Sequence, residues 1–81
     1  MMGKDVIYKN QKLTLTRFWT NDEPCLRIQS PDQIHLPKME FVGGYPNEYC
    51  IFIKNLSATE LAQIILPDGS SVDIKKELEN L

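Results

Sequence analysis

Apolar and polar side chains alternate along the first two thirds of the chain, in short runs that turn-forming residues separate. The clearest run is residues 12–20, where Leu13 and Leu15 fall on one side and Thr14 and Thr16 fall on the other. Alternation with a period of two predicts a half-buried β-strand. The same pattern, interrupted by Gly, Pro, Asn and Asp, predicts further short strands at residues 5–9, 25–30, 34–36 and 38–42.

Residues 49–54 read Tyr-Cys-Ile-Phe-Ile-Lys and break this alternation, because the first five are all apolar or aromatic. A run of this kind indicates a central strand that is covered on both faces. We expect one face to meet the C-terminal part of the chain. The other face carries Cys50 and Phe52, and Phe18 should join them. It is too apolar to be left in water, so strong curling of the sheet or a second copy should cover it.

The start of a helix is marked at residues 57–60, Ser-Ala-Thr-Glu. This is a capping box, in which the serine hydroxyl accepts the glutamate amide and the carboxylate reaches back to the serine amide. An apolar stripe with helical spacing follows, formed by Leu61, Ile64 and Ile65. Pro67 cannot continue a helix, so the sequence predicts a helix over residues 58–66.

Two structures compete for the remainder of the chain. Residues 66–70, Leu-Pro-Asp-Gly-Ser, are strong turn formers and could join two strands of a hairpin. Alternatively, Ser70 and Asp73 could cap a second helix, whose apolar positions would be Ile74, Leu78 and Leu81. We favour this second helix, at residues 71–80, because the stretch has high helix propensity. It would pack on the first as an αα-hairpin.

A helix pair around a turn invites comparison with the DNA-binding helix-turn-helix. The turn here is longer than the usual one and contains a proline. The second helix would carry more acid than base, with Asp73, Glu77 and Glu79 against Lys75 and Lys76. A recognition helix that enters the major groove among phosphates is rarely acidic, so the sequence does not predict this motif.

The elements together predict a single α+β domain over residues 1–81. It should contain an antiparallel sheet of four to five short strands followed by one or two C-terminal helices packed on one face. The sheet residues facing the helices should be Leu13, Leu15, Leu26, Ile28, Ile51 and Ile53, and the helix residues Leu61, Ile64 and Ile65. A chain of this length buries only about 60–65% of its extended surface, so the core is small and a homodimer would enlarge it.

Charge and cysteine content narrow the function classes. The net charge of −2 argues against tight nonspecific binding to nucleic acid, which depends on Lys and Arg. Cys25, His35 and Cys50 lie far apart in sequence and lack the short spacing of a metal site. We therefore expect free buried thiols, no metal or cofactor, and no enzymatic activity. A Cys–His nucleophile pair would need those residues to meet in the folded chain.

The N-terminal residues contain no apolar segment of the signal-peptide kind, and no stretch approaches the length of a membrane span. The expected protein is therefore soluble and cytoplasmic, with no membrane partner.

One group of residues resembles a binding surface. Basic and aromatic side chains interleave at Arg17, Phe18, Trp19, Arg27 and Tyr45. On a sheet, such a group can stack on the bases of single-stranded nucleic acid and contact its phosphates. The same residue types also dominate protein–protein interfaces. A third reading is that Phe18 and Trp19 are simply core residues.

The functional hypothesis is a small noncatalytic cytosolic binding protein. Its sheet-then-helix plan resembles that of short accessory proteins of phages and mobile elements, although no specific motif carries the resemblance. Such a resemblance implies binding and inhibition of a host or defence protein. The partner would then be another protein, either from the host or a second copy. The alternative is a nucleic-acid-binding regulatory module that uses the basic and aromatic residues.

Overall fold

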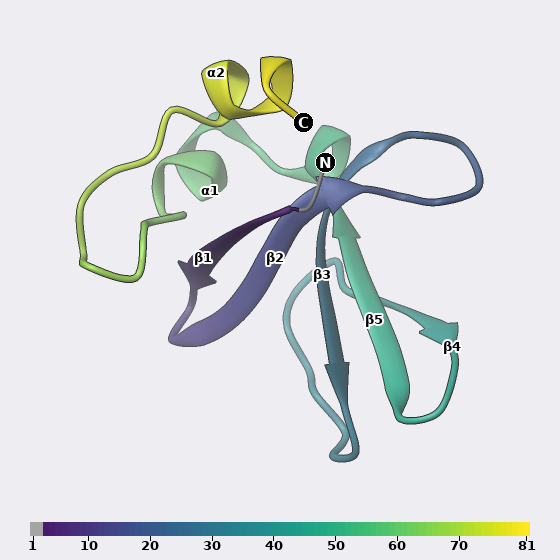
Figure 1. Cartoon of the computed structure of the whole chain (residues 1–81). Coiled ribbons are helices and arrows are strands. Elements are labelled where there is room, and N and C mark those ends of the chain that lie inside the picture. The colour runs from purple at the N-terminus through teal and green to yellow at the C-terminus, as the bar shows by residue number, and fades with distance from the viewer. Residues whose placement is uncertain (1–2) are drawn as a thin grey trace.

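The computed structural model describes residues 3–81 and consists of a five-stranded antiparallel sheet and two short α-helices (Figure 1). The strands lie in the order β1-β2-β3-β5-β4. Their bounds are β1 Lys4–Tyr8, β2 Gln11–Arg17, β3 Pro24–Ser30, β4 Glu40–Gly43 and β5 Asn47–Phe52. A 3-10 turn, η1 (Ile53–Asn55), precedes the helices α1 (Ala58–Ala62) and α2 (Ile74–Glu79). The predicted α+β class and antiparallel sheet are confirmed.

Turn residues set the strand order. The β1–β2 hairpin closes at Lys9 and Asn10, both with positive φ, which is the geometry of the tight hairpin turn that asparagine favours.

The predicted strand at residues 34–36 is wrong, because residues 33–36 form no regular structure. Pro31 and Pro37 bound this segment and remove backbone donors at both ends, so too few residues remain for a ladder. The chain crosses to the outer side of β5 before it forms β4.

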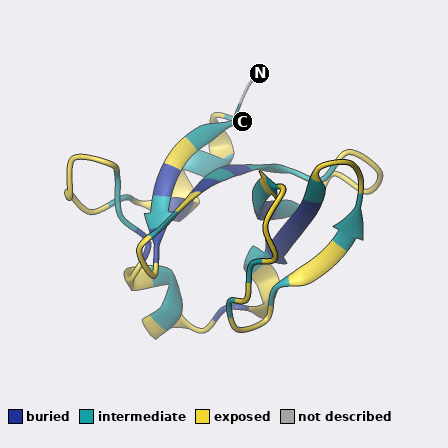
Figure 2. Cartoon of the chain, turned by 90° about the horizontal axis from the view of Figure 1, so that it is seen from below, coloured by how far each residue is buried: buried dark blue, intermediate teal, exposed yellow. Residues whose placement is uncertain are grey.

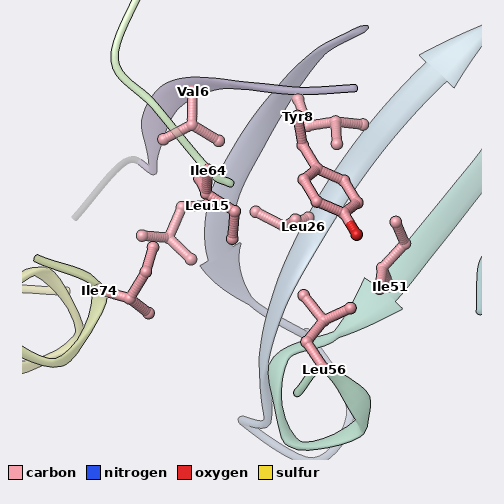
Figure 3. Close-up of a cluster of buried hydrophobic side chains, with 9 residues drawn as sticks. Val6, Tyr8, Leu15, Leu26, Ile51, Leu56, Ile64 and Ile74 are labelled. Atoms are coloured by element: carbon pink, nitrogen blue, oxygen red, sulfur yellow. The ribbon is translucent and has the colours of Figure 1, made fainter. Parts of the chain in front are cut away.

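The core lies on the concave side of the curled sheet (Figures 1 and 2). It consists of buried residues from β1, β2, β3 and β5 together with three from the C-terminal third: Val6, Tyr8, Leu13, Leu15, Leu26, Ile51, Leu56, Ile64 and Ile74 (Figure 3). Most of the predicted sheet residues are therefore in place. Ile53 differs from the prediction, because it belongs to η1 rather than to a strand. The Tyr8 hydroxyl is buried and finds no hydrogen-bond partner within residues 3–81.

The capping box that starts α1 is present as predicted. The Glu60 amide donates to the Ser57 hydroxyl at 3.2 Å, and the Ser57 amide donates to Glu60 Oε1 at 2.9 Å. The helix ends at Ala62, however, and not at residue 66. The cause is a pair of backbone hydrogen bonds between Ile7 and Ile65, of 2.8 and 3.0 Å, which require an extended backbone. Pairing with β1 thus replaces the last predicted helical turn and leaves Ile65 only half-buried.

Both structures that competed for the last residues are realised in part. The Leu66 amide donates to the Ser70 carbonyl at 2.8 Å, and a β-bridge joins Ile65 to Ser71. Helix α2 then begins later than predicted, because its N-cap is Asp73 rather than Ser70. Ser70 instead donates its hydroxyl to Asp68 at 2.6 Å. Since extended residues separate the two helices, the predicted αα-hairpin does not form.

The convex face of the sheet is covered largely by side chains of its own. Cys25 and Cys50 are fully buried there, although they point away from the core. Phe18 and Phe52 are half-buried and meet edge to face, with ring centroids 5.4 Å apart. The sheet also curls, as Figure 1 shows. Oligomerisation through this face stays a prediction. None of the helices formed by residues 3–81 is long and apolar enough to cross a membrane.

Two adjacent isoleucines provide a test of the core. Ile64 is 1% exposed and Ile65 is half-buried, although the helical pattern places both in the core. We expect Ile64→Ala to lower the free energy of unfolding by about 3 kcal/mol and Ile65→Ala by about 1 kcal/mol. Urea denaturation measures both values. Equal losses in the two variants would show that Ile65 is buried as deeply as Ile64.

The Glu60 carboxylate provides a test of pH dependence. The hydrogen bond from Lys38, followed by that from the Ser57 amide, lowers the pKa of Glu60 from 4.5 to about 2. Because the folded-state pKa is lowered, the stabilisation is complete above about pH 4.5 and is lost as the pH falls towards 2. In Glu60→Gln this part of the pH dependence should disappear. Glu79→Gln, which removes an exposed carboxylate, is the control. Urea midpoints measured across this range would contradict the assignment if Glu60→Gln kept the wild-type profile.

Candidate functional site

The loop between β2 and β3 presents the predicted residues Phe18 and Trp19 at one end of the sheet. Hydrogen bonds between its two ends fix its shape. The Phe18 amide donates to the Glu23 carbonyl at 2.7 Å, the Asp22 amide donates to the Phe18 carbonyl at 2.9 Å, and Arg17 Nη1 donates to the Asp22 carbonyl at 2.9 Å. The backbone of the loop is therefore held in one shape.

Aromatic contacts support the exposed tryptophan from below. Trp19 is 72% exposed, and its ring lies 5.6 Å from that of Phe18, which in turn contacts Phe52. We call these three residues the Trp19 cluster. Lys54 borders it, with Nζ 5.8 Å from the Phe52 ring and 3.5 Å from Glu23 Oε1. The cluster is thus an apolar ridge with a charged rim, and Trp19 is not a core residue.

The two arginines of the predicted surface are engaged within the molecule. Besides its bond to the β2–β3 loop, Arg17 donates from Nη2 to the Leu78 carbonyl at 3.2 Å and so ties α2 to the sheet. Arg27 grips Glu48 through two bonds, from Nε at 2.7 Å and from Nη2 at 3.1 Å. Gln29 also donates to Glu48, which is 8% exposed. Charge-assisted pairing of this kind anchors the convex face.

Tyr45 lies at the opposite end of the sheet from Trp19. It occupies the turn between β4 and β5, is fully exposed, and precedes a cis peptide bond to Pro46. In the antiparallel β3–β5 pair, Cys25 is opposite Phe52 and Ser30 is opposite Asn47, so the loops that precede these two strands lie at opposite ends (Figure 1). The structure therefore keeps Phe18 and Trp19 in contact, directs the Arg17 side chain to α2, and separates all three from Tyr45.

A groove beside β4 was not predicted from the sequence. It has a volume of about 550 Å³ and is lined by Pro31, Gln33, Ile34, His35, Leu36, Met39, Phe41, Asn47 and Tyr49. We call it the β4 groove. Phe41 is 62% exposed, and its ring meets that of Tyr49 edge to face at 5.6 Å. The signal that marks it in the sequence is a short segment between Pro31 and Pro37, with Ile34 and Leu36 as its apolar residues, that the prolines prevent from forming a strand.

The cysteines are placed where they cannot cooperate with the histidine. Both thiols are free and lie on the convex face, whereas His35 lines the β4 groove with Tyr49, which faces the concave side. Burial is the first cause that raises the pKa of Cys25 to about 12 and that of Cys50 to about 11. Within residues 3–81, no three His, Cys, Asp or Glu side chains gather as a metal site would require. The prediction of free, buried thiols is confirmed.

Comparison of the chain with protein-family models, with curated proteins and with solved structures found no match.

The raised pKa values of the two thiols predict that they react slowly with thiol reagents. At pH 8 and in the folded protein, Cys25 and Cys50 should react with Ellman's reagent about a hundredfold or more slower than in urea, because burial disfavours the thiolate. The Thr20→Cys variant adds an exposed thiol and serves as the reference for an accessible site. Rapid reaction of a native cysteine without urea would contradict this placement.

Proposed function

We propose that the protein is a small noncatalytic binding protein and that the Trp19 cluster is its contact with another protein. The observation that carries the proposal is the 72% exposed Trp19 side chain on a hydrogen-bonded loop. Tryptophan is among the residues most enriched at the energetic centres of interfaces. A small core would gain stability by burying a large apolar side chain. The exposure of Trp19 to water therefore supports a role for it in binding.

The geometry of the loop supports tight binding. Its hydrogen bonds hold the loop backbone on both sides of Trp19 in place before a partner arrives, which reduces the conformational entropy lost on association. Phe18 and Phe52 supply an apolar base, and Glu23 and Lys54 supply a polar rim. An apolar centre with a polar rim is the usual composition of an interface.

The class of protein that fits this plan is the short accessory protein of a phage or mobile element. On this proposal the protein acts in the cytoplasm and inhibits a host or defence protein by covering a surface that the partner needs. The small sheet-and-helix domain and its rigid aromatic loop support steric occlusion as the mechanism.

A second candidate function is binding of single-stranded nucleic acid, which the exposed Trp19 favours because a base can stack on it. The charges speak against it. Arg27 pairs with Glu48, Lys54 with Glu23, and Arg17 is bound to backbone carbonyls. Phosphate contacts would therefore have to compete with bonds already made.

A quantitative pull-down from the native cell tests the proposed function. The tagged wild-type protein should retain a specific partner, and Trp19→Ala should reduce its recovery about tenfold or more, since hot-spot truncations cost about 2 kcal/mol or more. Tyr45→Ala removes another exposed aromatic residue, at the opposite end of the sheet and outside the β4 groove, and should retain the partner.

Two results would contradict this proposal. One is unchanged recovery of every partner by Trp19→Ala. The other is binding of single-stranded oligonucleotides that weakens steeply with salt and requires Trp19, since this would establish the nucleic-acid function instead.

A further inference from the structure

The β4 groove is a second surface whose features do not depend on the Trp19 cluster. Its base is well fixed, because Leu36 and Met39 pack against the core and Tyr49 is 6% exposed. Its outer wall is Phe41, a large apolar side chain that is mostly in water. A rigid floor with an exposed aromatic wall can accept an apolar side chain with little rearrangement.

Next to the groove lies an open edge of the sheet. Strand β4 is the last strand in the order, and among residues 3–81 nothing pairs with its outer side. The opposite edge differs, because Ile65 pairs with Ile7 on β1. An open edge offers backbone donors and acceptors to an added strand. Because β4 has four residues and an irregular register between Phe41 and Gly43, such a strand would be short.

The register of β4 predicts the side-chain pattern of the added strand. Phe41 pairs with Tyr49 and faces the groove, whereas Glu40 pairs with Cys50 and faces the convex side. Successive residues of an added strand would therefore meet the groove and the Glu40 side in turn. An apolar residue suits the first position and a cation suits the second.

The charges around the groove are acidic. Asp32 is adjacent in sequence to the lining residues Pro31 and Gln33, and Glu40 is adjacent to Phe41. Neither carboxylate has an ion-pair partner in the described part of the chain, whereas Lys38, the cation of this segment, is bound to Glu60. The complementary partner is therefore positively charged. A second copy fits poorly, since edge-to-edge pairing would bring two acidic β4 strands together.

We propose that the β4 groove and the outer edge of β4 bind an extended segment of a partner protein in which apolar and basic residues alternate. The apolar side chain lies against Phe41 and Tyr49, the next, basic side chain lies on the Glu40 side, and Asp32 adds negative charge beside the groove.

The test uses two short end-blocked peptides, one alternating lysine with leucine and the other alternating glutamate with leucine. Each is titrated into the isotope-labelled full chain while amide chemical shifts are followed. The lysine peptide should shift residues 31–43 and bind about tenfold more tightly than the glutamate peptide at low salt. Phe41→Ala should abolish the shifts without unfolding the chain, since this side chain is exposed.

Charge variants separate the contribution of the acidic side chains from that of the apolar groove. Asp32→Asn combined with Glu40→Gln should reduce the preference for lysine to about twofold or less. Asp22→Asn combined with Glu79→Gln makes the same change in net charge elsewhere and should leave the preference intact. Trp19→Ala should bind the lysine peptide normally, so failure at the groove and failure of the proposed function are distinguishable.

Three outcomes would overturn the inference. These are equal binding of the two peptides, shifts centred outside residues 31–49, and self-association in light scattering that depends on Phe41. The last would assign the groove to a second copy of this chain.

Discussion

The structure depends on closing the concave side of one small sheet. Leu13, Leu15, Leu26 and Ile51 supply an apolar face that the strands cannot cover by themselves. Side chains from the short elements of the C-terminal third cover this face. Two backbone hydrogen bonds between Ile7 and Ile65 hold the C-terminal third against β1. Because burial of apolar area is the main stabilising term in so small a domain, the sheet and its C-terminal cover depend on each other.

Hydrogen bonds and ion pairs of charged side chains hold the parts of the chain that the apolar core does not fix. On the convex face, Arg27 and Glu48 form a pair with two hydrogen bonds beside the buried cysteines. Elsewhere, Arg17 links the β2–β3 loop to α2 by donating to backbone carbonyls of both. Lys38 similarly joins the segment before β4 to the cap of α1. These contacts hold loops in place rather than leaving cations for a ligand. For this reason our proposal assigns the binding role to the aromatic side chains rather than to the cations.

The antiparallel sheet also separates the exposed aromatic side chains. Trp19 lies before β3 and Tyr45 before β5, so the two strands hold them at opposite ends. Phe41 lies in β4, which leads into the turn that carries Tyr45, and Trp19 lies at the other end.

The sequence by itself determined the strands with clear alternation, the capping box at Ser57 and Glu60, and the buried cysteines, because local periodicity and side-chain chemistry suffice for these. It also determined that Phe18 and Trp19 lie together, since they are neighbours in the chain. Only the tertiary structure decided that α1 ends at Ala62, because the bonds between Ile65 and β1 join residues far apart in sequence. For the same reason only the fold could place Tyr45 away from Trp19, commit Arg27 to Glu48, and form the β4 groove from a segment too short to be a strand.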